Sequence, residues 1–276
     1  MVFQRLIWAA LVTAVVVGSL QTGVQRWQAA PLILAAEMYE SRKLGAPGPV
    51  APEAHMPSDS VVAHEHAPGH VVAEKWEPES GLERIGWTWV ANCLHAFSIG
   101  LLVFAVMGVW LYQRGAAVGS FVLAAWVAAA GFVSLHLWPS LGLHAEVPGM
   151  EAASLHARQV WWVLAVCSSA IACAVAGLSR SSWRWLVAAA LLALPFGVGA
   201  PQFQGHALAG FGPEARAALE QLEGQFIWAT TWVALSFWAS MGLVGGLVFE
   251  RWVRPCLLTV LKDADRTDVG IVKAVR

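Results

Sequence analysis

The sequence predicts an all-α, polytopic helical membrane protein with about six transmembrane helices. Of its 276 residues, 58% are hydrophobic and only 13% are charged, whereas about 25% of the residues in a soluble domain are charged. Charged residues are nearly absent from several runs of about 20 residues, and a run of that length can cross the hydrocarbon core as a helix. The 16 tryptophans also suit a membrane protein, because indole rings favour the lipid headgroup level. We therefore expect a single membrane domain, 1–276, surrounded by membrane lipid.

The apolar segments differ in character along the chain. The first begins like a signal peptide, but it continues through Gln21 and Gln25 without a small-x-small cleavage site, so we expect it to remain as a helix. The fifth is short and interrupted by Pro195, and the sixth carries Gly242 and Gly246 at the GxxxG spacing that lets helices approach closely. The predicted spans are residues 6–28, 86–112, 117–138, 158–178, 183–199 and 225–249.

The segments between these spans predict the orientation of the protein. If both termini are cytoplasmic, ten lysines and arginines lie inside and seven lie outside, which follows the positive-inside tendency. Residues 41–80 then form an outer loop, rich in histidine and proline and without apolar periodicity, that we expect to be mobile. Residues 251–276 are expected to form a polar cytoplasmic tail.

In this orientation, all nine histidines lie in outer loops or in the outer halves of helices, together with fourteen of the eighteen acidic residues. Imidazole and carboxylate groups are common ligands of borderline divalent metals, so this side of the protein is suited to collecting a cation. His64, His66 and His70 of the first outer loop form a candidate metal-capture arm. The alternative is a solvated linker with incidental histidines.

Two helical stripes of polar residues predict a vestibule open to the outside. Thr88, Asn92 and His95 are spaced four and three residues apart, which places them on one face of the second span. Gln25 belongs to a matching stripe in the outer half of the first span, and His136 ends the third span. For His95 the alternative to a ligand or pathway role is an interhelical hydrogen bond, and for His136 it is interfacial packing.

The connection between the third and fourth spans contains further candidates. His144 and Glu146 alternate along the chain as a pair of metal ligands would. We expect Glu151 in the first turn of the next helix, where the helix dipole favours an acidic residue. Arg158 lies four residues before Trp162, so its guanidinium can cover the indole ring or reach a carboxylate.

Several classes of function are excluded by the sequence. The net charge of −1 gives no case for binding nucleic acid. There is no GxxxxGK[ST] or GxGxxG motif for a nucleotide, and no HExxH motif or nucleophile–base pair for catalysis. The four cysteines include no CxxC pair. We therefore expect no enzymatic activity and no tightly bound cofactor.

Four stretches carry a family resemblance: GLERIGWTWVAN at residues 81–92, LHLWPSLGLHAEVPGM at residues 135–150, RQVWW at residues 158–162 and LALPFGVGAPQ at residues 192–202. Together they resemble the proposed cobalt-transporter subunit CbtA, and PLILAAEMYE at residues 31–40 resembles that family's exit from its first helix. The resemblance implies a multi-pass protein of the bacterial inner membrane, linked to cobalt uptake for cobalamin synthesis. It also implies a small single-helix partner, CbtB, with a histidine-rich end.

The resemblance also implies particular site residues. The matching stretches contain Glu37, Glu83, His136, Glu146 and Arg158. One position departs from the family pattern, because Phe196 stands where the family often has a histidine after the proline of the fifth span. The resemblance then leaves His95 or His206 as a replacement ligand.

Two functions from different classes remain. The first is a permease subunit whose outer histidines and glutamates capture Co²⁺, or Ni²⁺ by similar chemistry, and pass it into the vestibule. The second is an accessory or structural subunit of a larger assembly with other membrane subunits. Ligand type alone does not choose between cobalt and nickel, because affinity follows the general metal series.

Overall fold

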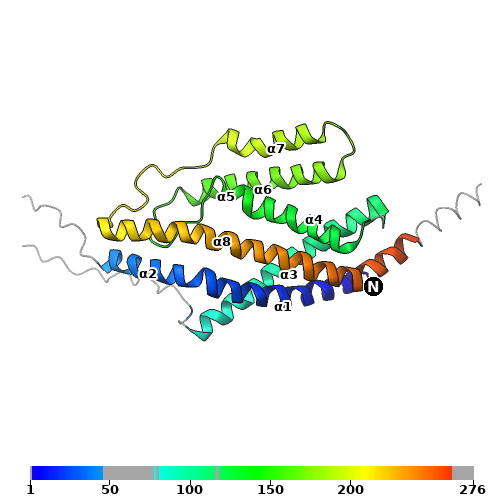
Figure 1. Cartoon of the computed structure of the whole chain (residues 1–276), viewed down its shortest axis with the longest axis horizontal. Helices are drawn as coiled ribbons and strands as arrows, with labels where there is room; N and C mark the ends of the chain where they lie inside the picture. Colours follow the sequence, from blue (N-terminus) through cyan, green and yellow to red (C-terminus); the bar gives the residue numbers. More distant parts are fainter. Residues whose placement is uncertain (1, 46–77, 79–80, 116–117, 263–276) are drawn as a thin grey trace, which may run out of the picture.

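The computed structural model describes residues 2–45, 78, 81–115 and 118–262, and over these residues it is helical without a strand, which confirms the all-α prediction. The long helices lie beside one another in a bundle (Figure 1). In order, the helices are α1 (Val2–Gln28), α2 (Ala30–Gly45), α3 (Leu82–Arg114), α4 (Ser120–Phe132), the π-helix η2 (Val133–Leu137), α5 (Trp138–Ser140), α6 (Leu155–Leu178), α7 (Arg184–Val198), α8 (Pro213–Val248) and the π-helix η3 (Phe249–Val253).

Five of the described helices are long and apolar enough to cross a membrane. They are α1, α3, the continuous helix Ser120–Ser140, α6 and the helix Pro213–Lys262 that contains α8. The predicted fifth span corresponds to α7, which has 15 residues. At 1.5 Å per residue it is about 22 Å long, shorter than the hydrocarbon core of about 30 Å. The structure therefore has five full-length candidates and one shorter apolar helix, against about six predicted.

Helices α1 and α2 follow each other with a break of one residue, Ala29. The break lies next to Pro31, which has no N–H to donate and is therefore tolerated only near the start of a helix. Helix α2 extends through Gly45, so the predicted outer loop 41–80 begins too early. Glu40, Arg42 and Lys43 are good helix formers, which explains why the helix continues past residue 41. The other described residue of that loop is Pro78.

Small residues allow the long helices to approach closely. A methyl group built on Gly242 would lie 3.0 Å from the Ala128 Cβ of α4, and one built on Gly246 would lie 3.1 Å from the Ala124 Cβ. The GxxxG prediction is therefore confirmed as the contact between α8 and α4. Gly18 of α1 meets α3 still more closely. Around these contacts lies the main core, which includes Phe104, Met107, Met241 and Phe249.

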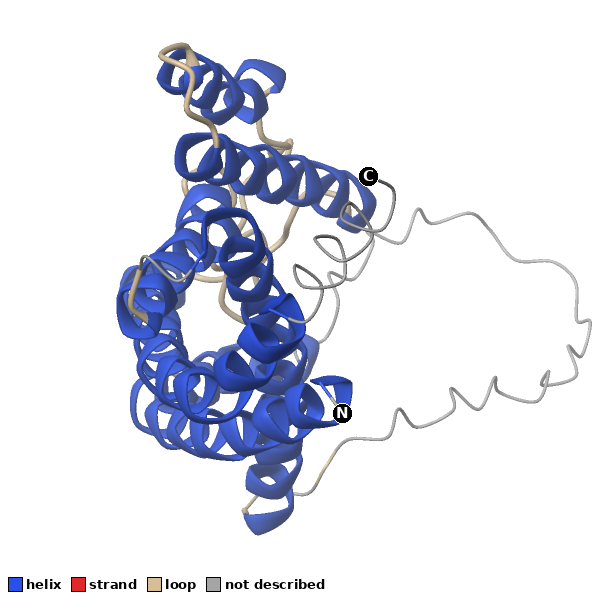
Figure 2. Cartoon of the chain, turned by 90° about the vertical axis from the view of Figure 1, so that its right-hand side faces the viewer, coloured by secondary structure: helices blue, strands red, loops and turns tan. Residues whose placement is uncertain are grey.

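Helices α6 and α7 form a layer beside the rest of the bundle (Figures 1 and 2). The indole N–H of Trp138 donates to the Leu192 carbonyl at 3.0 Å, and that of Trp161 donates to the Pro195 carbonyl at 3.0 Å. Phe196 stands edge-on to both indole rings. The residue that departs from the family pattern therefore belongs to an aromatic cluster that holds α7 in place.

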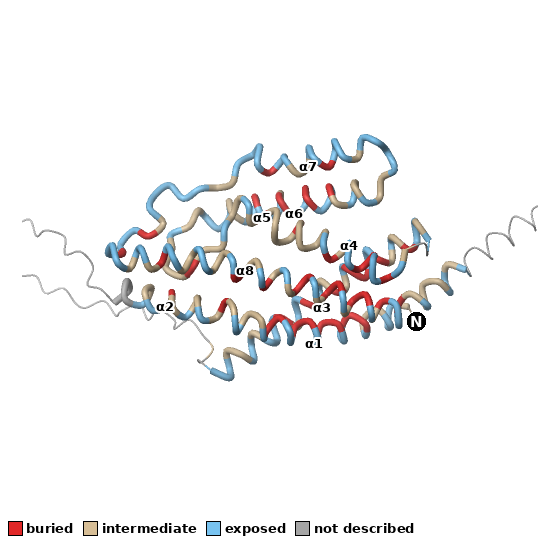
Figure 3. The backbone as a smooth tube through the Cα atoms, viewed as in Figure 1, coloured by how far each residue is buried: buried red, intermediate tan, exposed pale blue. Residues whose placement is uncertain are grey.

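A second, smaller core lies at the end of the bundle that contains α2, which we call the α2 end. It joins Ala36 of α2, Val147, Leu208 and Phe211 of two connections, and Leu219 of α8. Outside these clusters most residues are exposed or of intermediate burial (Figure 3). The exposed residues include many large apolar side chains that suit contact with lipid. The α1–α2 rod and α8 are longer than a bilayer is thick, and the connections at the α2 end fold against them.

The helix after α8 continues through η3 to Lys262. The predicted tail at residues 251–276 is therefore helical over its first twelve residues, and residues 263–276 lie outside the described part of the chain. The described chain begins and ends on the same side of the molecule (Figure 1).

Candidate functional site

A cavity of about 800 Å³ lies between α1, α2, α3, η2, α6 and α8. Polar residues of both predicted stripes line this cavity. Most of the remaining wall is apolar. The polar and charged lining residues are Gln21, Thr22, Gln25, Arg26, Arg84, Thr88, His95, His136 and Thr230.

His95 lines this cavity from α3. Its ring centroid lies 5.0 Å from that of Phe237 on α8, at an interplanar angle of 38°. The residue is exposed, and within the described part of the chain no hydrogen bond to a neighbouring helix holds its imidazole. The alternative of an interhelical hydrogen bond is therefore not supported, and the imidazole is left available to a ligand in the cavity.

His136 reaches the same cavity from a π-helix. Pro139 has no N–H to donate to the carbonyl four residues earlier, and the Trp138 N–H reaches back to the Val133 carbonyl. The half-buried imidazole packs on Phe132 with ring centroids 5.5 Å apart, and its Nε2 atom lies 3.5 Å from the Thr231 Oγ1 atom of α8. Single π-helical turns are frequent at functional sites, and this turn occurs at a predicted site residue.

Asn92 has a structural role in the wall of the cavity. Its Nδ2 atom donates to Thr22 Oγ1 at 3.0 Å and to Gln25 Oε1 at 2.8 Å, so it fastens α3 to α1. Gln25 lines the cavity, but its amide oxygen is already occupied by Asn92. Of the stripe predicted on α3, Thr88 and His95 therefore line the cavity, whereas Asn92 makes interhelical hydrogen bonds of the kind that join membrane helices.

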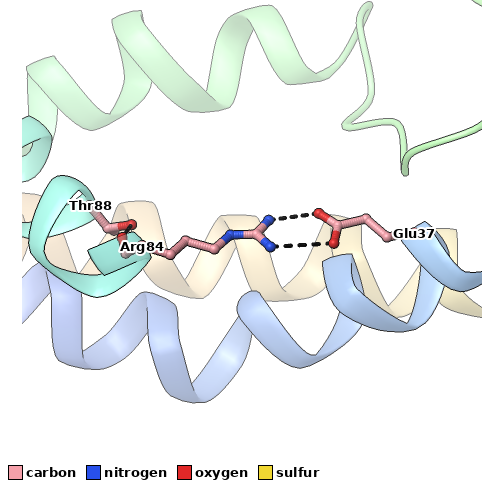
Figure 4. A network of polar contacts seen from close by, with 3 residues as sticks. All are labelled: Glu37, Arg84 and Thr88. Atoms are coloured by element: carbon pink, nitrogen blue, oxygen red, sulfur yellow. Dashed lines mark hydrogen bonds and ion pairs between the residues drawn. The ribbon is translucent and has the colours of Figure 1, made fainter. Parts of the chain in front are cut away.

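Glu37 is engaged in an ion pair and is not a free ligand. Its two carboxylate oxygens accept from the Arg84 guanidinium at 2.6 Å and 3.4 Å, which joins α2 to α3 (Figure 4). Thr88, one turn further along α3, donates to the Arg84 carbonyl at 2.7 Å. Glu83 is an exposed residue of the first turn of α3 and does not line the cavity.

The predicted pair His144 and Glu146 lies outside the cavity. Glu146 accepts from the Arg158 guanidinium at 2.9 Å, and each side chain is about 30% exposed. Of the two contacts predicted for Arg158, the structure therefore shows the one with a carboxylate. His144 is exposed and, like Glu146, interacts electrostatically with Glu223 of α8.

The expected position of Glu151 in the first turn of a helix is wrong. Helix α6 begins at Leu155, with the hydroxyl of Ser154 accepting from the Ala157 N–H at 3.4 Å. The Glu151 N–H donates instead to the Ala207 carbonyl at 2.7 Å and so joins two connections at the α2 end. Serine is a strong N-cap residue, which accounts for the later helix start.

A complete metal site is not assembled within the described ranges: over residues 2–45, 81–115 and 118–262, no three histidine, cysteine, aspartate or glutamate side chains lie together closely enough to hold a metal ion. His64, His66 and His70 lie outside the described residues. Of the predicted ligands, the structure therefore brings His95 and His136 to one cavity.

Four polar residues that line the cavity are absent from the predicted stripes and sites. Thr22 lies one turn before Gln25 on α1. Arg26 follows directly after Gln25, Arg84 lies four residues before Thr88 on the same stripe of α3, and Thr230 approaches from α8. Extending the α3 stripe by one turn would have found Arg84. Thr230 carries no such signal, because it is the packing of α8 against the other helices that exposes it to the cavity.

Comparison with known proteins agrees with the resemblance in the motifs. A family model described as "Probable cobalt transporter subunit (CbtA)" matches residues 3–250. The match extends over every helix that lines the cavity. No curated protein and no solved structure matches the chain.

Proposed function

Since the chain belongs to the CbtA family of probable cobalt transporter subunits, we propose that it is a permease subunit of the bacterial inner membrane whose cavity receives Co²⁺, or Ni²⁺ by similar chemistry, during uptake. The description of the family names a transporter subunit, so at least one further chain takes part in transport in this proposal. The α2 end faces the outside in this proposal, and both termini are cytoplasmic.

The observation that carries the proposal is that His95 and His136 both line one cavity. The two imidazoles come from different helices, and amide and hydroxyl groups of α1, α3 and α8 line the same space. Imidazole suits the late first-row divalent metals. Two imidazoles with water or amide oxygens make an incomplete ligand set, and a transported ion must be bound weakly enough to leave again.

Further ligands come from outside the described structure in this proposal. His64, His66 and His70 belong to the outer loop and act as a capture arm that raises the local metal concentration. A small, single-helix, histidine-rich subunit of the CbtB type provides additional imidazoles near the cavity. Both features account for a cavity that holds histidines without a complete metal site in the described residues.

The test is cobalt uptake in cells that lack other cobalt importers and express the chain together with its partner subunit. We expect His95→Ala and His136→Ala each to lower the initial uptake rate about tenfold or more, because each removes an imidazole from a site that has few ligands. His144→Ala is the matched control, since it removes an exposed imidazole outside the cavity. The amount of each variant in the membrane is measured by immunoblotting.

Uptake at the wild-type rate in both cavity variants would contradict the permease site. The same result would favour an accessory or structural subunit, the second candidate. One observation favours this candidate: four of the predicted site residues are engaged in structural contacts within the chain and are therefore not free to bind a metal. They are Glu37, Asn92, Glu146 and Arg158. A purified complex that keeps its partners but transports without the two histidines would support it.

A further inference from the structure

The cavity is much larger than a hydrated divalent cation. Its volume is about 800 Å³, whereas six water molecules around an ion occupy about 180 Å³ at about 30 Å³ each. Volumes of about 300–1,000 Å³ with largely apolar walls are typical of sites for small organic molecules. The walls here include Ile33, Ile85, Phe226 and Val233. The size and lining therefore suit an organic ligand better than a bare ion.

The charged groups on the cavity wall have the wrong sign for a bare cation. Arg26 of α1 and Arg84 of α3 line it, whereas none of its described lining residues is an aspartate or a glutamate. Arg84 is compensated by Glu37, and Arg26 is exposed, with no ion pair within the described part of the chain. Among the residues that the structure describes, one positive charge thus remains without compensation, and it repels a divalent cation and attracts an anion.

The polar groups occur in a definite order along the cavity. Arg26 and Arg84 lie towards the α2 end, and His95 follows Arg84 by 11 residues, about 16 Å along the axis of α3. Thr88 lies between them, and Ile99 lies one turn beyond the histidine. A ligand that enters from the α2 end therefore meets guanidinium groups first and the His95 imidazole later.

We infer that cobalt enters this cavity as a complex with a small anionic organic chelator of the polycarboxylate class, and not as the hydrated ion. The inference rests on the proposed function and specifies its substrate. Free carboxylate groups of the complex pair with the Arg26 guanidinium, a geometry that arginine favours, and its carbon skeleton lies against the apolar wall. Deeper in the cavity, the imidazoles replace water molecules bound to the metal, and cobalt stays divalent throughout.

The experiment compares uptake of radioactive cobalt supplied as the free ion and as its citrate complex. Citrate is a suitable probe because the trianion outweighs the charge of the divalent ion, so the complex is negative. The host lacks other cobalt importers and citrate uptake of its own, and it expresses the chain with its partner subunit. Total cobalt is held constant while citrate is raised until most of the metal is complexed.

We expect wild-type uptake to be maintained or to rise as the complex replaces the free ion. Arg26→Glu should lower uptake of the complex about fivefold or more relative to uptake of the free ion, because it reverses the charge at the entrance. Arg216→Gln is the control, since it removes an exposed arginine of α8 that does not line the cavity, and its ratio should equal that of the wild type.

Wild-type uptake that falls in proportion to free Co²⁺ would overturn the inference and leave the proposed function intact. Equal ratios for Arg26→Glu and Arg216→Gln would overturn it as well. Absence of cobalt uptake in either form, with the wild-type chain and its partner present in the membrane, would count against the proposed function itself.

Discussion

The contact between α1 and α3 predicts that Gly18→Ala destabilises the protein. A methyl group built on Gly18 would lie 2.7 Å from the Cys93 Sγ atom and 2.8 Å from the Cys93 Cα atom. The second distance involves the backbone, so no change of rotamer relieves it. Carbon atoms in favourable contact are about 3.5–4.0 Å apart, and the two helices would therefore have to separate by about 1 Å.

The magnitude follows from what this separation does to the surrounding contacts. A gap of about 0.5–1 Å forfeits a quarter to a half of the attraction between packed atoms, and Ala14, Val17 and Ala96 are buried in this part of the core. Overpacking of this kind costs about 1–3 kcal/mol, and the better helix propensity of alanine offsets up to about 1 kcal/mol. We expect a net loss of about 1–2 kcal/mol in the free energy of unfolding.

The measurement is the thermal midpoint of the purified protein in detergent, followed by tryptophan fluorescence. A loss of about 1–2 kcal/mol should lower the midpoint by about 2–4 °C for a chain of this size. Gly23→Ala is the matched control on the same helix, because nothing lies within 4 Å of its added methyl group, and it should be neutral or slightly stabilising. A midpoint for Gly18→Ala at or above that of the wild type would refute this account of the contact.

Three further substitutions test other contacts with the same measurement. Asn92→Ala should cost about 1 kcal/mol, since it removes two interhelical hydrogen bonds worth about 0.6 kcal/mol each in a membrane protein. Ser98→Ala is the control, because the Ser98 hydroxyl bonds only within its own helix. Equal midpoints for the two variants would contradict the assigned bonds. Glu37→Gln should cost less than about 1 kcal/mol because both side chains of its pair with Arg84 are over a third exposed. A variant with arginine at position 37 and glutamate at position 84 should recover most of the loss. A double-mutant cycle without coupling would count against the pair. Gly142→Ala should cost about 1–3 kcal/mol because its methyl group would lie 2.2 Å from an indole ring of α6, and an unchanged midpoint would mean that this connection packs differently.

The helices and one wall of the cavity could be predicted from the sequence. Long apolar runs identify membrane helices because they are long enough to cross the hydrocarbon core. The spacing of Thr88, Asn92 and His95 identifies one face of a helix because the helical period is fixed. The Gly242–Gly246 spacing likewise predicts a close contact, and the structure shows that α4 makes it.

Local patterns did not reveal the partners of the charged residues. Glu37 and Arg84 are separated by 47 residues, and Glu146 reaches Arg158 only because the connection at the α2 end folds back on α6. A carboxylate in a loop looks the same in the sequence whether it binds a metal or an arginine. The choice depends on which side chain lies within about 3 Å of it.

The sequence by itself determined the all-α class, the positions of the long apolar helices and the residues that share a face of each helix, since these depend on local composition and on a fixed period. Only the tertiary structure decided which faces meet. Apolar surface gains little from helix association in lipid, so close contacts of small residues and interhelical hydrogen bonds select the partners. As a result, His95, His136 and Arg26 line one cavity, and Asn92 joins α3 to α1 by hydrogen bonds.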